Sequence, residues 1–512
     1  MAKHHSRQAS PRRRVRPAWR GTTRAGAATA GAALLSLTLA LPARPQSASE
    51  PVSAISLPQI DVDAASSAGG PPAARYLAPT TRSATRTDTP LRDVPQSVTV
   101  TTREAIRDLY MRGLQDVLRY TPGTGYAQGE GNRDTPVLRG QSTTASLFVD
   151  GLRDDAQYIR DLYNIDRVEV LLGPNAMIFG RGGAGGVINR VTRQPEWQES
   201  REVRLQAGMY HNYRGSFDLG GAVNDRAAVR LLGVYEESDS YRDGVTLRRY
   251  GINPGVALRL GEDTTLRLTY EHFHDERVAD RGIPSFRGEP LRTGTGTYFG
   301  DPSQSPVRIT VNAVNAVLEH RFAEGVTLRN ATRYADYDKF YQNIFPTGVN
   351  AAGTAATLGA YSNATQRTNL LNQTDLQFSL RTGPFEHRLL AGVELGRQET
   401  ANQRLTGYFT SLGPNATSLS VPLGSPRVSV PVIFRPSATD ANNSGVATNA
   451  AFYVQDQVQI LPSLQLIGGV RLETFQVDFT NTRTRDEIRT NDATIAPRLG
   501  LIVTLVGYFG LL

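Results

Sequence analysis

The sequence predicts an all-β transmembrane barrel with a small N-terminal α+β domain. Three observations favour this fold class. The chain begins with the composition of an export signal, its C-terminal part alternates apolar and polar residues with a period of two, and short turns alternate there with long polar connections. No later stretch reaches the ~20 apolar residues that a spanning helix needs, so a membrane-bound form would cross with strands.

Residues 1–43 have the organisation of a signal peptide. Eight Lys and Arg side chains, with no acidic residue among them, lie before an Ala- and Leu-rich stretch from Ala25 to Leu41. The formal net charge is +8, and +8 − 8 leaves zero after residue 24, so the sequence does not support a nucleic-acid partner. A transmembrane anchor is the alternative, but the most apolar part is only about ten residues long.

Residues 44–90 are rich in Ser, Ala, Pro and Thr, which predicts a flexible tether. Within it, the segment LPQIDVDA, Leu57 to Ala64, is a lone β-favouring stretch with alternating apolar residues. The alternative is a chance run within a linker.

Residues 91–195 have the pattern of a compact α+β domain. The segment QSVTVTT predicts a strand, and Thr101 with Glu104 has the spacing of a capping box that opens a helical stretch through Leu118. Gly113 interrupts this stretch and Pro122 ends it. Four short strands are then expected in PVLRG, SLFVDGLRD, DRVEVLLGP and GGVINRVT.

The segment Gly180 to Gly185 fits the G-x-G-x-x-G spacing of a dinucleotide-binding loop. A phosphate cradle requires a helix directly after the glycines, but Gly186 to Thr192 is a β-branched run that predicts a strand. We therefore expect the glycines of this domain to serve tight turns and close strand approach. They are Gly173, Gly180, Gly182, Gly183, Gly185 and Gly186.

Residues 196–512 carry the period-two alternation. Short turns are expected near residues 224–226, 261–263, 323–325, 381–386 and 461–463. Between them lie long polar connections, notably 275–307, 338–367 and 398–446. Alternation also suits a soluble sandwich, but tight turns on one side and long loops on the other are typical of an outer-membrane barrel.

The stretches DVPQSVTVTTREAI, DVLRYTPG, VLRGQ, FVDGLRD and QYIRDLYNIDRVEVLLGPNAMIFGRGGAGGVINRVTRQP resemble the plug domain of TonB-dependent outer-membrane receptors. RGIPS, TYFGDP, VTLRNATRY, LLAGVEL and FYVQDQ resemble the barrel of the same family. The resemblance covers residues 55 to 503 and is greatest to catecholate-type ferric-siderophore receptors. It implies a plug domain at 91–195 and a receptor β-barrel at 196–512.

The resemblance also implies 22 antiparallel strands, of which about eleven or twelve are expected here. Twelve strands would close to a barrel only about 24 Å across, which is too narrow for a plug about 37 Å in diameter. The sequence therefore predicts about half of a barrel, truncated or frameshifted near residue 503, where alternation is lost.

By resemblance, the function is import of a ferric siderophore across the outer membrane of a Gram-negative bacterium, driven by TonB. The alternatives are another cargo (a cobalamin, haem or a glycan) or an inactive fragment. The expected partners are TonB, ferric siderophore and outer-membrane lipid; the chain is expected to be a monomer with no resident cofactor or metal. The sequence has no recognisable catalytic frame, so no enzyme is predicted. The implied TonB box is Leu57, Pro58, Gln59, Ile60, Asp61, Val62, Asp63 and Ala64.

The resemblance places ligand contacts on the outward loops of the plug. A ferric tris-catecholate is an aromatic trianion, so cations and aromatic rings are expected to bind it. The first choices are Arg153, Gln157, Tyr158 and Arg160, the second choices are Arg133 and Gln141, and the loop residues Arg287, Tyr298 and Phe299 are expected to close over the ligand. Alternatively, Arg139 and Arg160 are structural and pair with carboxylates of the plug or barrel wall.

Overall fold

A computed structural model describes residues 76–182 and 185–504. The chain divides into two units, Met1–Ala64 and Ala65–Leu512, and every described residue belongs to the second. The expected signal peptide, the segment Leu57–Ala64 and Gly183 lie outside the described residues.

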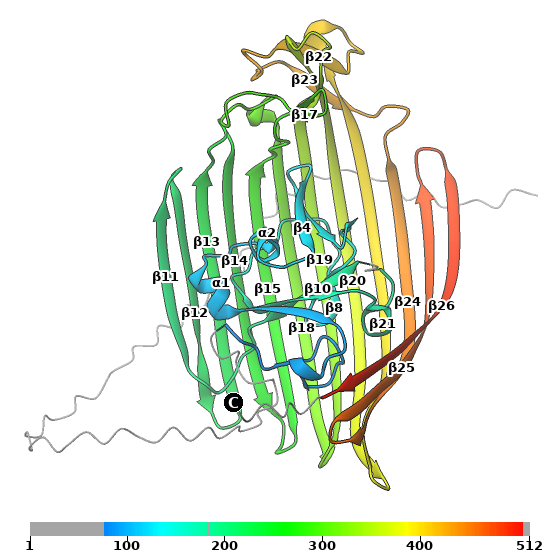
Figure 1. Cartoon of the computed structure of the whole chain (residues 1–512). Helices are drawn as coiled ribbons and strands as arrows, with labels where there is room; N and C mark the ends of the chain where they lie inside the picture. Colours follow the sequence, from blue (N-terminus) through cyan, green and yellow to red (C-terminus); the bar gives the residue numbers. More distant parts are fainter. Residues whose placement is uncertain (1–75, 183–184, 505–512) are drawn as a thin grey trace, which may run out of the picture. The chain divides into compact units, whose positions relative to one another are not determined.

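Twelve antiparallel strands pair in sequence order in one large sheet (Figure 1), and two further short strands, β22 (Ser418–Pro422) and β23 (Val432–Arg435), pair with β20 and β21. This number agrees with the eleven or twelve strands expected from the sequence. In the described part of the chain, the first and last strands each have a single pairing partner. The strands are β11 (Ser200–Gly208), β12 (Asn212–Asn224), β13 (Ala227–Asp239), β14 (Thr246–Arg259), β15 (Thr264–Val278), β18 (Pro306–Ala323), β19 (Val326–Val349), β20 (Ala355–Thr382), β21 (Phe385–Phe409), β24 (Asn442–Leu461), β25 (Leu464–Asn481) and β26 (Asp486–Val503).

All five expected short turns join neighbouring strands of this sheet. The expected long loop at 275–307 is also present, between β15 and β18, and contains β16 (Ser285–Phe286) and β17 (Glu289–Pro290). The expected loop at 338–367 is wrong, because β19 and β20 pair almost to the turn at 350–354. The loop expected at 398–446 shrinks to 410–441, since β21 and β24 extend into it. Backbone pairing continues through polar sequence, which side-chain polarity alone does not reveal.

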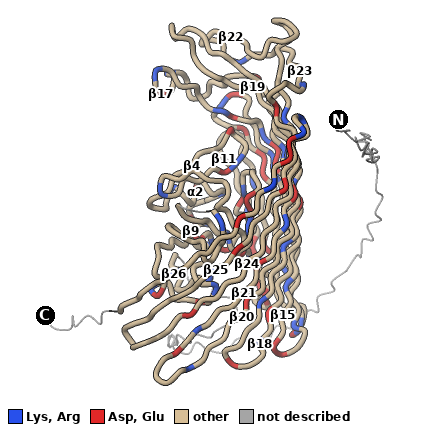
Figure 2. The backbone as a smooth tube through the Cα atoms, turned by 90° about the vertical axis from the view of Figure 1, so that its right-hand side faces the viewer, with Lys and Arg blue, Asp and Glu red and all other residues tan. Residues whose placement is uncertain are grey.

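The two faces of the large sheet differ in chemistry. The plug lies against one face, as the positions of β4, α2 and β9 show in Figure 2. The opposite face presents exposed apolar side chains, among them Leu268, Val314, Leu370, Leu395 and Phe452. This alternation is that of a strand with a lipid side and an interior side. Within 76–182 and 185–504, no helix is long and apolar enough to cross a membrane.

The plug is built on a mixed five-stranded sheet with the strand order β3-β9-β10-β7-β8. A second small sheet consists of β4, β5 and β6, and three short helices complete the domain. The bounds are β3 (Ser97–Thr102), α1 (Arg103–Asp108), α2 (Leu114–Arg119), β4 (Thr124–Gly129), β5 (Arg133–Leu138), β6 (Gln141–Ser142), β7 (Leu147–Val149), β8 (Leu152–Arg153), β9 (Ile165–Leu172), α3 (Ala176–Phe179) and β10 (Gly186–Thr192).

The helices follow local sequence chemistry. Leu114, Val117 and Leu118 occur at i, i+3 and i+4 of α2 and are buried in the plug core. The expected capping box at Thr101 is wrong by one residue. Thr102 is the N-cap of α1, and its side chain accepts a hydrogen bond from the Ala105 N–H at 3.3 Å. Both residues are paired with β9 in the sheet, but only Thr102 is followed directly by the first helical residue, Arg103.

Residues 80–90 differ from the flexible tether expected there. They form β1 (Thr80–Thr81) and β2 (Thr89–Pro90), with a buried connection between them. Gln455 donates to the Thr85 carbonyl at 3.0 Å, and Gln377 donates to the Arg86 carbonyl at 2.7 Å. Composition predicted a linker because these residues are small and polar, but polar side chains of the large sheet satisfy their backbone groups.

The glycine run has the geometry of turns. Gly173, Gly180 and Gly182 have φ values of 105°, 70° and 89°, which favour glycine. A Cβ on Gly185 would lie 2.0 Å from the Leu138 carbonyl oxygen, so two strands approach closely there. The run leads into the strand β10.

Candidate ligand-binding site

A cavity of about 490 Å³ lies between the plug loops and the inner face of the large sheet, on the long-loop side of the plug. The plug contributes residues of the 130–133, 144–145 and 155–157 segments. The sheet contributes β18, β19, β20, β21 and β24. Its lining residues are Glu130, Asn132, Arg133, Thr144, Ala145, Asp155, Ala156, Gln157, Ile309, Tyr337, Lys339, Tyr341, Tyr361, Asn363, Thr365, Arg367, Thr400, Asn402, Arg404 and Asn443.

Strand register brings the wall residues of this cavity together. Lys339 of β19 is paired with Thr365 of β20, and two residues further along Tyr341 is paired with Asn363. Because successive side chains of a strand point to opposite faces, every second residue of β19 and β20 faces the plug. The cavity wall is therefore a direct product of the period-two alternation.

Tyr341, Tyr361 and Arg404 line the cavity, and Phe345 and Arg281 contact these tyrosines without lining it. The Tyr361 ring centroid lies 5.5 Å from that of Tyr341 and 5.5 Å from that of Phe345, both in edge-on contact. Arg404 lies over the Tyr361 ring at 3.8 Å, and Arg281 lies over the Phe345 ring at 4.2 Å. Such an arrangement offers both aromatic rings and positive charge to a ligand.

The side chains that line the cavity carry a net positive charge. Its ionic side chains are Arg133, Lys339, Arg367 and Arg404 against Glu130 and Asp155, so 4 − 2 leaves two positive charges. Burial would raise the pKa of the Glu130 carboxyl, but the hydrogen bond from Arg133 and nearby positive charges hold that pKa below its ordinary value. The cavity is therefore suited to an anionic, aromatic ligand.

Two of the expected ligand residues, Gln157 and Arg133, line this cavity. Gln141, which was a second choice, is exposed on β6 and is not part of the lining.

Arg153, Tyr158 and Arg160 are buried and use their polar groups inside the protein. The Arg160 guanidinium contacts Asp154 at 3.0 Å and Asp134 at 3.3 Å, and it also donates to backbone carbonyls. Burial would raise the pKa of Asp154, but Arg160 and Arg190 hold it well below its ordinary range. These contacts argue for the structural alternative at Arg160, because a ligand could reach its guanidinium only by breaking them.

Arg153 and Tyr158 also use their polar groups in hydrogen bonds within the plug. Arg153 donates to the carbonyls of Ala145 at 2.8 Å and Arg181 at 2.6 Å. The Tyr158 hydroxyl donates to Asp154 at 3.2 Å, and burial raises the pKa of Tyr158 to about 12. Both residues therefore shape the loops that border the cavity, and neither lines it.

The three expected loop residues lie outside the cavity lining. Tyr298 is buried and donates to the Ala279 carbonyl at 2.8 Å. Phe299 belongs to an apolar cluster with Ile344 and Phe409 that anchors the long loops. Arg287 is exposed, with φ of 54°, and lies over the Phe286 ring.

Sequence reasoning missed the wall residues Lys339, Tyr341, Tyr361, Arg367 and Arg404. They fall in segments that were expected to be loops. Continuing the period-two count of β19 and β20 through these segments would have placed them on one face. No sequence signal could have shown which plug loop they meet.

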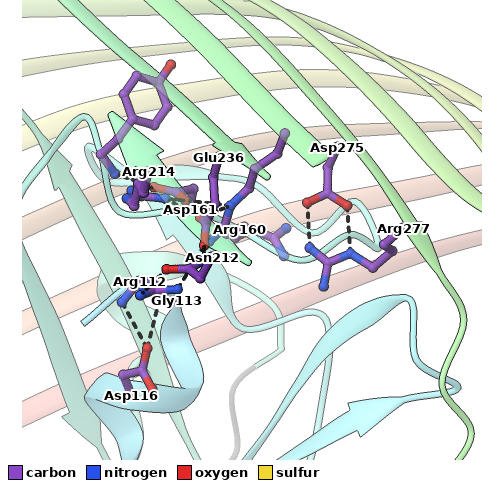
Figure 3. A network of polar contacts seen from close by, with 12 residues as sticks. Arg112, Gly113, Asp116, Arg160, Asp161, Asn212, Arg214, Glu236, Asp275 and Arg277 are labelled. Carbon is purple, nitrogen blue, oxygen red and sulfur yellow. Dashed lines mark hydrogen bonds and ion pairs between the residues drawn. The ribbon is translucent and has the colours of Figure 1, made fainter. Parts of the chain in front are cut away.

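A second polar cluster joins the plug to β12, β13 and β14 (Figure 3). Arg214 contacts Asp161 of the plug through two nitrogens at 2.9 and 2.8 Å, and it contacts Glu236 at 2.6 Å. Arg112 of the plug contacts Glu236 from the other side at 2.8 Å. Burial would raise the pKa of Asp161, but Arg214 and Arg249 hold it well below its ordinary range. This cluster holds the plug against the sheet, away from the cavity lining.

Comparison with known proteins agrees with this architecture. Residues 90–187 match the family described as TonB-dependent Receptor Plug Domain, and residues 252–508 match the family described as TonB dependent receptor-like, beta-barrel. The chain is similar to the probable TonB-dependent receptor BfrD of Bordetella pertussis, with 32% identity over 65% of this chain and 46% of BfrD. It is also similar to the catecholate siderophore receptor Fiu of Escherichia coli K12, with 29% identity over 76% of this chain and 54% of Fiu.

Among solved structures, the siderophore receptor PiuA from Acinetobacter baumannii shares the fold. The TM-score is 0.75 with 23% identity, covering 81% of this chain and 63% of PiuA. The chain spans about half the length of the curated relatives it matches. With a plug domain followed by strands of a receptor barrel, the chain belongs to the TonB-dependent receptors, a family of Gram-negative outer-membrane proteins.

Proposed function

We propose that this chain binds a ferric siderophore with aromatic, anionic chelating groups and belongs to a receptor that imports it into the periplasm. The supporting observation is the cavity, whose wall combines the Tyr341 and Tyr361 rings with cationic side chains. A ferric tris-catecholate carries a threefold negative charge and flat aromatic faces, which such a wall complements. The similarity to Fiu, a catecholate siderophore receptor, also supports this ligand class.

Energy for import would come from TonB, because the outer membrane holds no ion gradient. The segment Leu57–Ala64 is our proposed TonB box, which would pair with TonB by strand addition. The signal peptide at 1–43, the tether that follows it and the limits of the plug at 91–195 and of the barrel at 196–512 belong to the same proposal. Outer-membrane lipid would contact the exposed apolar face of the sheet, in a monomeric receptor.

Binding to the chain refolded in detergent tests the ligand class. The ferric complex of 2,3-dihydroxybenzoate should quench the intrinsic fluorescence with saturable affinity. Replacing both Tyr361 and Arg404 by Ala should weaken binding by about tenfold or more, since each contributes about 1 kcal/mol through ring stacking and charge. The matched control, Arg397→Ala, removes an exposed cation that pairs with Glu399 and does not line the cavity.

Other cargoes give distinct outcomes in the same assay. Cyanocobalamin, haem and maltodextrin serve as competitors, together with a ferric hydroxamate. Binding of one of these in place of the ferric catecholate would assign the cavity to a different ligand class. Binding of none of them by a folded chain would contradict the proposed function.

A further inference from the structure

We propose that Lys339 couples ligand binding in the cavity to the outward loops of the plug. While the cavity is empty, its ammonium is hydrogen-bonded to these loops. When a ligand binds, the ammonium releases a loop and binds an anionic group of the ligand instead. The inference rests on the proposed function and adds a positioning residue to it. Lys339 lies on β19, in the wall of the large sheet, but its hydrogen-bond acceptors all belong to the plug.

The Lys339 ammonium joins two separate plug loops. It donates to the Asn132 side-chain oxygen at 2.6 Å, to the Asn132 carbonyl at 3.3 Å and to the Gln157 carbonyl at 2.7 Å. An ammonium has three N–H donors, so all of them are used. Asn132 and Gln157 both line the cavity, which places this contact directly beside the ligand volume.

Lys339 differs from the other cations of the cavity in having only neutral partners. Arg133 contacts Glu130 at 2.6 Å, Arg367 contacts Asp155, and Arg404 contacts Asp440 at 3.6 Å. Among the residues that the structure describes, no carboxylate lies within 4.0 Å of the Lys339 nitrogen. Its charge is therefore balanced by dipoles alone, and an anionic group of a ligand would be its first charged partner.

Residue choice supports a specific role at this position. The chain has 56 Lys and Arg residues, and Lys339 is the only Lys after the leader, where Lys3 lies. Three acceptors converging from two loops suit a compact ammonium, whereas the planar fork of Arg suits a carboxylate. At 9% exposure, the side chain has little room for a larger group.

The number of donors on the ammonium explains why a ligand must displace a plug acceptor. Because all three donors are used, an anionic oxygen of the ligand can bind the ammonium only if at least one plug acceptor is released. A ligand oxyanion adds the attraction between two full charges, which a neutral carbonyl does not offer, so an oxyanion that reaches the ammonium should displace one of these acceptors. The loops at 128–134 and 155–158 then lose their link to the wall. Loosening should be visible at the Asn132 and Asp134 amides, which are bonded to the Gly129 and Tyr158 carbonyls.

Amide hydrogen exchange with and without the ferric complex of 2,3-dihydroxybenzoate tests the coupling. In the parent chain, the complex should accelerate exchange in 128–134 and 155–158 by about tenfold, because a local contact worth about 1.4 kcal/mol is released. In Lys339→Met, the amides of these loops should exchange rapidly with or without the complex. Lys339→Gln keeps a donor but loses the charge, so its loops should stay protected and show no response. Lys339→Arg keeps the charge and should recover part of the response.

The outcomes separate this inference from the proposed function. If the parent binds the complex and its loops do not respond, or if Lys339→Gln responds like the parent, the coupling is wrong and the ligand assignment stands. If the folded parent does not bind the complex, both are overturned. Fluorescence-detected unfolding of each variant identifies any general loss of fold. Such a loss would also raise amide exchange in β9 and β10.

Discussion

At the scale of single residues, the plug shows that a cationic side chain in an outward loop need not face a ligand. Arg160 was an attractive ligand residue because it lies in a polar loop between Tyr158 and Asp161. Its side chain is 0% exposed and is enclosed by Asp154, Asp134 and three backbone carbonyls. A buried charge of this kind stabilises only if its partners stay in place.

Replacing Arg160 by Met should therefore destabilise the plug. Asp154 would lose one of its buried cationic partners, and breaking such a pair typically costs about 3–5 kcal/mol. Urea unfolding followed by intrinsic fluorescence measures the loss, with the exposed Arg287→Met as control. A normal unfolding free energy combined with lost ferric-catecholate binding would instead return Arg160 to the ligand site.

Gly185 gives a second test at the residue scale. A Cβ there would meet the Leu138 carbonyl carbon at 2.9 Å as well as its oxygen, and neither atom can move without shifting β5. Gly185→Ala should lower the free energy of unfolding by about 2 kcal/mol or more, in the range of overpacked sites. Gly468→Ala is the matched control, because nothing lies within 4 Å of its Cβ position. Saturable binding of ATP or NAD to the parent would contradict the turn interpretation of the whole run.

At the scale of elements, residues 84–87, which precede the plug sheet, are bonded to the large sheet by a series of side chains. Arg498 donates to the Ala84 carbonyl, and Gln457 donates to the Thr87 hydroxyl at 2.7 Å. Between these contacts, the buried Arg86 side chain donates to the Tyr453 hydroxyl at 2.7 Å. A tension transmitted from the N-terminal side would reach these contacts before the plug sheet.

Arg86→Met should weaken this attachment. Asp375 and Glu394, which lie 3.7 and 3.4 Å from the Arg86 guanidinium, would lose a buried partner, with an expected cost of about 3 kcal/mol. Arg381→Met is the control, because its pair with Glu386 is exposed and such pairs contribute about 0–1 kcal/mol. Equal losses of unfolding free energy in the two variants would show that the segment is not anchored through Arg86.

At the scale of the whole described unit, polar clusters between the plug and the large sheet should make docking depend on pH. Asp161 has a folded pKa below its unfolded value of about 3.9, so its contribution is present above that pH and is lost as pH falls through the folded pKa. The parent should therefore exceed Asp161→Asn in unfolding free energy by about 3 kcal/mol at pH 7. This difference should shrink below pH about 4. A difference that stays constant during acidification would contradict the assignment.

Energy coupling also belongs to the scale of the whole molecule. In a full-length receptor that carries this segment, Ile60→Pro should abolish siderophore uptake while leaving ligand binding unchanged, because strand addition requires the backbone N–H that Pro lacks. Uptake of iron-labelled complex by an iron-limited Gram-negative host measures this effect. Ile60→Ala is the control and should retain most of the uptake. Normal uptake by the Pro variant would exclude this segment as the TonB box.

Local sequence patterns predicted the family, the order of plug and barrel, and the five short turns of the sheet. These depend on local chemistry, namely turn residues, period-two alternation and a long characteristic stretch around Arg167 to Pro195. The alternation also predicted which side chains share a face in the strand segments that it marked, such as 203–209 and 266–270. The outer ends of β19 and β20 were not predicted, because pairing with a neighbouring strand extends them through polar residues.

Which polar residues face the cavity depends on the tertiary structure. Arg160 and Gln157 are three positions apart in one loop, yet one is enclosed by carboxylates and the other lines the cavity. Lys339 meets Asn132 across 207 residues of sequence and meets Gln157 across 182. Such meetings depend on how the plug seats against the sheet, and that seating is a sum of many weak contacts between distant segments, which no local pattern encodes.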